Sequence, residues 1–220
     1  MGYFKYVPDF NYVDITADAK IGSYTRMKNL FRRIKLSDEV FQTATLFEKY
    51  QIRGDDRPDN VAYSYYNNAE LDWLVLISNN IVNVQTEWPM PQLVFDSFLI
   101  NKYGSYDELN AVHHYETIEV KNSRGMTIVE QGLQVKQGMT YTYYEEDQNS
   151  FVTTNDATLP VTNYQHETKI EEGKRNISLI RKQYLPVIFD EIDKLMEYKK
   201  GSSDYISGTL KSSSNIKLTT

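Results

Sequence analysis

The sequence predicts an α+β protein, because helical and strand-like patterns occupy separate stretches of the chain. Between Glu167 and Tyr198, apolar residues recur at steps of three, four or seven, which is typical of an amphipathic helix. Segments 115–121 and 126–130 instead alternate or are β-branched, and the intervening residues 122–125 suit a hairpin turn. We therefore expect helices on either side of a β-rich region.

The composition bounds the class of protein. Hydrophobic residues make up 40% and charged residues 25% of the 220 residues, which is enough for a packed core. The formal net charge of -6 argues against nucleic acid and against an anionic membrane surface as partners. No apolar run reaches the length of a transmembrane helix. The absence of cysteine excludes disulfides and thiolate chemistry.

Tyrosine is unusually frequent, with 18 copies. Its side chain combines a large rigid ring with a polar hydroxyl group and is enriched at protein interfaces. Packing within the protein's own core and sheets is the competing explanation, and we assign about half of the tyrosines to it.

Residues 1–48 are expected to form an arm followed by a helix. Pro8 interrupts an aromatic stretch without helical spacing, which predicts an extended arm lying against another subunit. Residues 25–35 have apolar side chains at helical spacing and a basic opposite face, which is either solvated or docked on an acidic neighbour. The interface residues predicted in this region are Tyr3, Phe4, Tyr6, Phe10, Arg32 and Arg33.

Residues 49–92 are expected to form a small strand-helix-helix unit. A strand through residues 47–53 leads into a Gly-Asp-Asp turn, and Pro58 follows where a first helical turn favours proline. Residues 69–78 are almost wholly apolar, which predicts a buried second helix. The residues predicted to build this core are Tyr50, Ile52, Gly54, Val61, Ala62, Tyr65, Leu71, Trp73, Leu74 and Asn80.

Two further regions follow in the sequence. Residues 93–164 are expected to contain a helix ending near Gly104 and then the β-rich region with its hairpin. Residues 165–200 are expected to form a long C-terminal helix, kinked near Pro186 because proline removes a helical hydrogen bond.

The last segment, residues 201–220, is rich in serine and has two glycines. It offers too little apolar surface to offset the entropy of ordering its backbone, so we expect an extended tail held by a partner. Ile216 and Leu218 alternate with polar residues and are the tail residues predicted to enter a partner's pockets.

No motif supports catalysis, so we expect a non-enzymatic protein with no cofactor and no metal site. His113 and His114 are adjacent in a predicted strand, so their side chains should point to opposite faces and not share a metal ion. His166 lies in a polar stretch, and no HExxH motif completes a zinc site. Neither a G-x-S-x-G elbow nor a glycine-rich phosphate loop is present.

The segment from Tyr50 to Ala62 resembles the opening of a LysM module, which has an aromatic strand, a Gly-Asp turn and a helix with an aliphatic-Ala pair. Leu71 stands at the second-helix Leu of that pattern, and residues 79–81 stand at its closing Asn-x-aliphatic step. Gly54-Asp55-Asp56 replaces the usual Gly-Asp-Thr, and residues 87–92 replace the closing strand with its Pro-Gly-Gln turn. The resemblance implies a LysM-like core.

A second resemblance covers more of the chain. The Trp73-Leu74-Val75-Leu76 run, the Trp88-Pro89-Met90 step and the stretch 113–116 resemble the LysM-containing baseplate wedge subunit of T4-like contractile-tail phages. Trp88 is the further interface residue predicted. The resemblance implies a virion subunit of the tail baseplate, assembled in the host cytoplasm into a symmetric hetero-oligomeric ring. Its implied partners are other wedge subunits and a sheath-initiator-like subunit near the tail tube.

Two functions of different classes follow from these patterns. The first is a structural subunit that clamps neighbouring wedge subunits during baseplate and tail assembly. The alternative is a LysM-type module that binds peptidoglycan through N-acetylglucosamine polymers. Only the second should retain chitin oligomers or purified cell wall.

Overall fold

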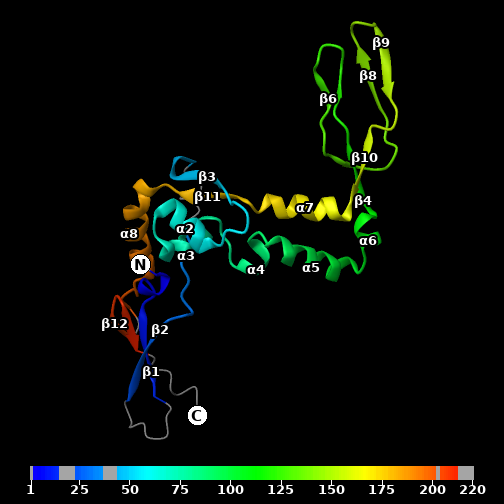
Figure 1. Cartoon of the computed structure of the whole chain (residues 1–220). Coiled ribbons are helices and arrows are strands. Elements are labelled where there is room, and N and C mark those ends of the chain that lie inside the picture. Colours follow the sequence, from blue (N-terminus) through cyan, green and yellow to red (C-terminus); the bar gives the residue numbers. More distant parts are fainter. Residues whose placement is uncertain (1, 15–22, 37–43, 202–203, 213–220) are drawn as a thin grey trace. The chain divides into compact units, whose positions relative to one another are not determined.

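The computed structural model describes residues 2–14, 23–36, 44–201 and 204–212 (Figure 1). The mixture of helices and several small sheets confirms the α+β class. The chain forms two compact units. Unit 1 combines residues 1–88 with residues 175–220, and unit 2 consists of residues 89–174, which are inserted into unit 1 in the sequence.

Unit 1 is built around a two-stranded antiparallel sheet with helices from the intervening sequence. Strand β3 pairs with β11, and Ile177 lies opposite Tyr50 in the register. Tyr66 on α2 donates a hydrogen bond from its hydroxyl group to the Ile180 carbonyl of β11 (2.9 Å). The elements are η2 (Ala44–Leu46), β3 (Phe47–Gln51), α2 (Pro58–Tyr66), η3 (Ala69–Leu71), α3 (Asp72–Ser78), α4 (Val84–Glu87) and β11 (Asn176–Ile180).

Local sequence signals set the ends of these helices. Pro58 lies in the first turn of α2, after an extended Arg57, where its missing N–H is not needed. Asn67 ends the helix in the left-handed conformation at φ 59°, which asparagine adopts more readily than most residues. The Asn68 side chain then accepts a hydrogen bond from the Glu70 N–H and begins η3. The expected strand-helix-helix order is therefore present.

The core of unit 1 lies between this sheet and the helices. Trp73 is 6% exposed, and Val61, Ala62 and Leu74 are fully buried. Leu179 and Ile180 of β11 join the same cluster, so the core draws on sequence from both sides of the inserted unit.

Tyr3 and Tyr6 pack on this core, which overturns the prediction that these two residues lie on another subunit. Tyr3 and Tyr6 contact the Trp73 ring at centroid distances of 6.0 and 5.4 Å, and Tyr6 also stacks on Phe189. Phe4 remains 59% exposed and contacts Tyr3 edge-on. The segment forms η1 (Tyr3–Lys5), and the aromatic ring that Tyr3 and Tyr6 contact belongs to their own chain.

A four-stranded sheet in unit 1 overturns two further predictions. Its order is β12-β13-β1-β2, with β13 parallel to β1 and the other pairs antiparallel. Residues 25–35 do not form the expected helix, since β2 occupies their first part. Residues 205–212 are ordered by their own chain and not by a partner, while Ile216 and Leu218 lie outside the described residues. The strands are β1 (Asp9–Val13), β2 (Tyr24–Lys28), β12 (Tyr205–Ser207) and β13 (Leu210–Ser212).

The predicted helix over residues 165–200 is also wrong as one element. It divides into α7 (Asn163–Gly173), strand β11, η4 (Lys182–Tyr184) and α8 (Leu185–Met196). Ile177 matches helical spacing but pairs with β3 across the sheet, a partner that a local pattern does not show. Pro186 lies in the first turn of α8, where it is tolerated, so no kink is needed.

Unit 2 contains the predicted β-rich region between helices (Figure 1). A three-stranded sheet has the order β10-β4-β7, and β5-β6 and β8-β9 are two antiparallel pairs. The predicted turn over residues 122–125 is present, with Gly125 at φ 78°. The elements besides α7 are α5 (Gln92–Tyr103), α6 (Tyr106–Asn110), β4 (Val112–Thr117), β5 (Val120–Lys121), β6 (Thr127–Val129), β7 (Gln134–Val135), β8 (Tyr141–Glu145), β9 (Ser150–Thr154) and β10 (Thr158–Thr162).

Replacing Trp73 by alanine should lower the free energy of unfolding by about 3–5 kcal/mol, because it leaves a cavity under Tyr3 and Tyr6 in the unit 1 core. Urea denaturation measures this difference. Phe31→Ala is the matched control: that ring is 95% exposed, so the change should stay within about 0.5 kcal/mol. Equal losses in the two variants would show that Trp73 is not part of the core.

Candidate protein interface

The most exposed aromatic side chain of unit 1 lies in the turn after β2. Phe31 is 95% exposed and its neighbour Leu30 is 71% exposed. Asn29 holds the turn in place: its N–H donates to the Pro8 carbonyl (2.9 Å), its side-chain oxygen accepts from the Phe31 N–H (3.2 Å), and its amide donates to the Tyr198 hydroxyl (2.9 Å). A fixed backbone therefore presents two apolar side chains to solvent.

The two predicted basic interface residues follow this turn and have different roles. Arg32 donates to the carbonyls of Met196 (3.0 Å) and Glu197 (3.2 Å) and lies 5.2 Å from the Tyr198 ring centroid. It therefore satisfies free carbonyl groups at the C-terminal end of α8, where a cation is favoured. Arg33 is exposed and lines an apolar cavity.

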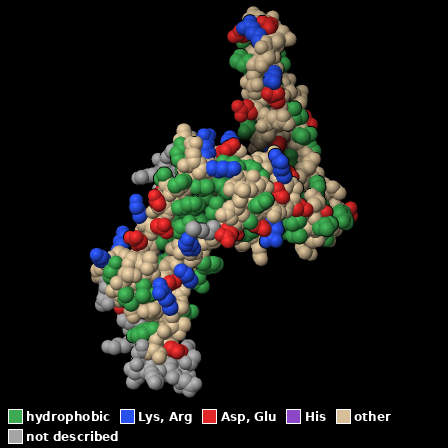
Figure 2. All heavy atoms as spheres, turned by 60° about the vertical axis from the view of Figure 1, so that its left-hand side comes forward, with side chains coloured by type: hydrophobic (Ala, Val, Ile, Leu, Met, Phe, Trp, Pro, Cys, Tyr) green, Lys and Arg blue, Asp and Glu red, His purple; other side chains and the backbone are tan. Residues whose placement is uncertain are grey.

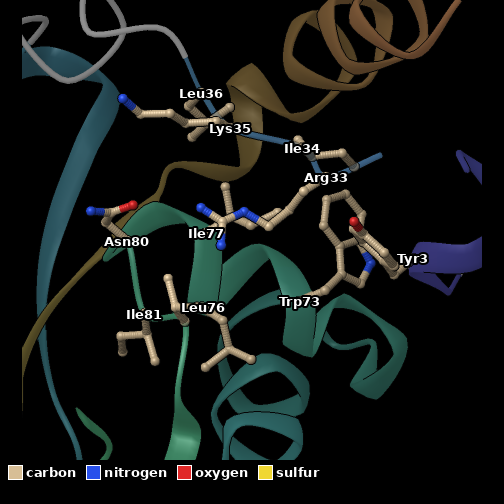
Figure 3. A pocket seen from close by; sticks show the side chains of 11 residues that line it. Tyr3, Arg33, Ile34, Lys35, Leu36, Trp73, Leu76, Ile77, Asn80 and Ile81 are labelled. Carbon is tan, nitrogen blue, oxygen red and sulfur yellow. The ribbon is translucent and has the colours of Figure 1, made fainter. Parts of the chain in front are cut away.

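That cavity lies in unit 1 and has a volume of about 250 Å³ (Figure 3). Tyr3 and Trp73 lie at one end of its lining in the view of Figure 3, and Asn80 and Ile81 lie toward the other. The Trp73 indole N–H has no hydrogen-bond acceptor among the described residues. The complete lining is Tyr3, Arg33, Ile34, Lys35, Leu36, Trp73, Leu76, Ile77, Asn80, Ile81 and Val82.

Trp88, predicted as an interface residue, is instead part of the unit 1 core. It is 5% exposed, and its indole N–H donates to the Asp56 carbonyl (3.0 Å). Arg175 donates to the Gly54 carbonyl from the other side of the inserted unit in the sequence. The turn between β3 and α2 is therefore held by two side chains of its own chain.

The residues predicted for the LysM-like core lie together in unit 1. Six of them are buried, namely Ile52, Val61, Ala62, Leu71, Trp73 and Leu74. Tyr50 and Tyr65 are partly buried and pack edge to face at 6.2 Å. Gly54 and Asn80 are exposed turn residues with φ of 50° and 54°. Phe10, predicted at an interface, is partly buried on β1 and contacts Tyr12.

Figure 2 shows hydrophobic side chains in several patches of the visible face, interspersed with side chains of both charges. Large apolar side chains that the sequence did not single out as interface residues are exposed in both units. In unit 2 these include Leu93 and Val94 on α5 and Phe151 on β9. Their exposure depends on tertiary packing, so the spacing of apolar residues along the sequence does not predict it.

A buried carboxylate joins two helices of unit 2. Glu167 on α7 accepts hydrogen bonds from Lys102 Nζ (2.7 Å) and from the Tyr103 hydroxyl (2.8 Å) on α5. Burial alone would raise the pKa of Glu167, but the bonds from Lys102 and Tyr103 outweigh it and lower the pKa below its ordinary value. The carboxylate is therefore held ionised in the folded protein.

The three histidines lie together in unit 2, contrary to the geometric argument from the sequence. Ligand atoms of His113, His114 and His166 lie within 4.8 Å of one another. The rule of opposite faces fails because β4 contains a β-bulge: Val161 pairs with His114 and Thr162 pairs with Val112, so His113 has no partner in the register. The bulge brings the two adjacent side chains to one side.

These features define a protein that presents exposed apolar side chains on an ordered backbone. No helix in the described part of the chain is long and apolar enough to cross a membrane. The chain matches the family model described as Base plate wedge protein 53 over residues 3–195, and it therefore belongs to this family of phage baseplate proteins. No curated protein sequence matches the chain.

Membership of this family gives the chain a structural role in the phage baseplate, in association with other baseplate subunits of the virion tail. A structural family favours a non-enzymatic protein, as the sequence predicts.

Replacing Glu167 by glutamine should reduce the stability of unit 2 at pH 6 by about 1–2 kcal/mol, since Lys102 is partly exposed and its charge is screened. A carboxyl group with a lowered pKa stabilises the fold above its unfolded pKa and loses this effect as the pH falls through the folded value. The difference between the wild type and the variant should therefore shrink between pH 6 and pH 3. Urea midpoints at both pH values measure it, and a difference independent of pH would contradict the assignment.

Proposed function

We propose that this protein is an inner wedge subunit of a contractile, T4-like phage baseplate that clamps neighbouring wedge subunits together. The observation that carries this proposal is the exposed pair Leu30 and Phe31 on a turn held by Asn29. Interface energy concentrates in a few large side chains that enter a partner's pocket. A turn that is ordered before binding loses little entropy on association.

Edge strands supply a second kind of contact. Strand β2 is at the edge of the four-stranded sheet, and all five of its side chains are exposed. An edge strand offers unpaired main-chain N–H and C=O groups to a strand of another chain. The edge strand and the Phe31 turn are adjacent in the sequence, so one partner surface could engage both.

Ring symmetry would multiply such contacts. A moderate interface repeated around a closed ring becomes strong, because each later contact forms at a high effective concentration. We infer that the partners are other wedge subunits and a sheath-initiator-like subunit near the tail tube, assembled in the host cytoplasm.

We further propose that the unit 1 core is a LysM-like module interrupted by unit 2. Its order is β3, α2 and α3, and the strand that pairs antiparallel with β3 is β11, which follows the insertion. This arrangement supports the proposal because it provides the closing strand that residues 87–92 lack. In this view the module is a rigid platform for the assembly.

The peptidoglycan-binding alternative receives less support from the geometry. A LysM groove would use the turn between β3 and α2, but Trp88 and Arg175 donate hydrogen bonds to carbonyls of that turn. A glycan would find both carbonyl groups already hydrogen-bonded within the chain. We therefore propose that the module is structural.

Phe31→Asp should weaken wedge assembly at least about tenfold, which corresponds to roughly 1.4 kcal/mol, because a carboxylate cannot enter an apolar pocket without losing its hydration. Purified wedge subunits mixed with the variant and analysed by sedimentation velocity provide the measurement. Tyr63→Asp, which makes the same charge change at an exposed aromatic residue of α2, is the matched control. Normal assembly by Phe31→Asp, or equal loss in both variants, would remove Phe31 from the interface.

Chitin oligomers and purified cell wall should not retain the wild-type protein in a pull-down. The reason is that two carbonyl groups of the turn between β3 and α2 already accept hydrogen bonds from side chains of the same chain. A known LysM protein serves as the positive control. Retention that is lost on adding soluble chitin oligomers would establish the glycan-binding function instead.

A further inference from the structure

The whole histidine content of the chain is gathered at one point in unit 2. The sequence has three histidines and no cysteine. Two of the histidines come from the bulge in β4, and the third comes from the first turns of α7, about fifty residues later in the sequence. Imidazole is the preferred ligand of late first-row divalent metals when thiolates are absent. The three histidines are therefore a candidate metal site.

The separations between the ring nitrogens are close to those of a metal site. His113 Nδ1 and His114 Nδ1 lie 2.8 Å apart, and the ligand atoms of all three residues lie within 4.8 Å. Tetrahedral zinc with nitrogen ligands at about 2.0–2.1 Å requires neighbouring nitrogens about 3.4 Å apart. Shifts of roughly 1–1.5 Å at the ring atoms would satisfy this geometry, which side-chain torsions can supply.

A carboxylate already orients one of the three rings. His114 Nε2 lies 3.2 Å from Glu116 Oε1, and Lys169 Nζ holds the same oxygen at 2.8 Å. A bond from Nε2–H to the carboxylate leaves the lone pair on Nδ1 of His114. That nitrogen is hydrogen-bonded to Nδ1 of His113 (2.8 Å), and a metal ion would replace this hydrogen bond. Metal-binding histidines commonly have a carboxylate partner of this kind, which fixes the ring and makes it a better ligand.

We propose that His113, His114 and His166 bind one late first-row divalent metal ion, for which zinc is the test ion, with water as the fourth ligand. The ion would join β4 to α7 and so fix the first turn of α7 on the bulged strand. Its role is structural: it adds a link within unit 2. This inference is independent of the proposed clamping role.

Binding would require one rearrangement that can be observed. His113 and His166 are stacked, with centroids 4.0 Å apart and planes at 12°. Stacked rings direct their lone pairs in parallel, so at least one ring must turn before both nitrogens can face one ion. His113 is exposed and has room to turn.

The test is a zinc titration of the full-length, tag-free and chelator-treated protein, followed by NMR of the imidazole groups. Because the chain has only three histidines, each imidazole can be observed separately. We expect one zinc ion per chain, with a Kd below about 10 μM, and coordinated shifts of all three imidazole signals. The melting temperature should rise with zinc concentration, since a ligand that binds only the folded state stabilises it.

Three variants make the outcome decisive. His113→Ala and His166→Ala should each weaken zinc binding at least about tenfold, and Glu116→Gln, which keeps all three ligands, should weaken it by about 10–100-fold. His113 is exposed, so His113→Ala tests the ligand set even if His166→Ala impairs folding. Absence of zinc binding up to about 100 μM, a binding energy near 5.5 kcal/mol, would overturn the proposal. Binding that survives both alanine variants would also overturn it.

Discussion

The pairing of β3 with β11 is the interaction on which unit 1 depends. It joins two segments separated in the sequence by the whole of unit 2, and hydrogen bonds from the C-terminal end of α3 and its capping residue reinforce it. Asn79 accepts from the Ser178 N–H (2.7 Å) and donates to the Ser178 carbonyl (2.9 Å), so its side chain acts like a neighbouring strand. The Ser78 hydroxyl donates to the same carbonyl at 2.9 Å. These bonds satisfy backbone groups of β11 that pairing with a single strand leaves open.

The pairing of β3 with β11 also determines which aromatic residues of unit 1 are buried. Once β3, α2, α3 and β11 form the core, Trp73 presents an aromatic face to the N-terminal segment, and Tyr3 and Tyr6 cover it. Tyr3 and Tyr6 are therefore committed to the chain's own fold. The large apolar side chains that remain exposed in unit 1 include those on turns, above all Phe31. A subunit of an assembly needs separate apolar side chains for its core and for its interfaces, because a side chain buried in the core cannot also contact a partner.

Unit 2 has its own means of stabilisation. Polar side chains connect its helices and strands: Glu167 joins α7 to α5, and Glu116 joins β4 to α7 through Lys169. Its two apolar clusters are small, with Phe95, Leu99 and Leu109 in one and Val120, Val129 and Ala157 in the other. Small clusters leave a larger share of the stability of unit 2 to ion pairs and hydrogen bonds, and the contribution of these ion pairs depends on pH.

Local sequence patterns were enough to predict the α+β class, the strand-helix-helix order around residues 47–78, the buried position of Trp73 and the hairpin turn at residues 122–125. These features depend on local spacing and turn residues, which act over a few positions. The strand β11 and the histidine cluster depend on contacts between distant segments of the chain. Residues 176–180 have helical spacing but form β11, because β3 offers hydrogen bonds that no local pattern reveals. One extra residue in β4 turned His113 beside His114, and only packing of α7 against β4 added His166. Long-range pairing and a single bulge act between segments distant in the sequence, so the folded chain alone specified them.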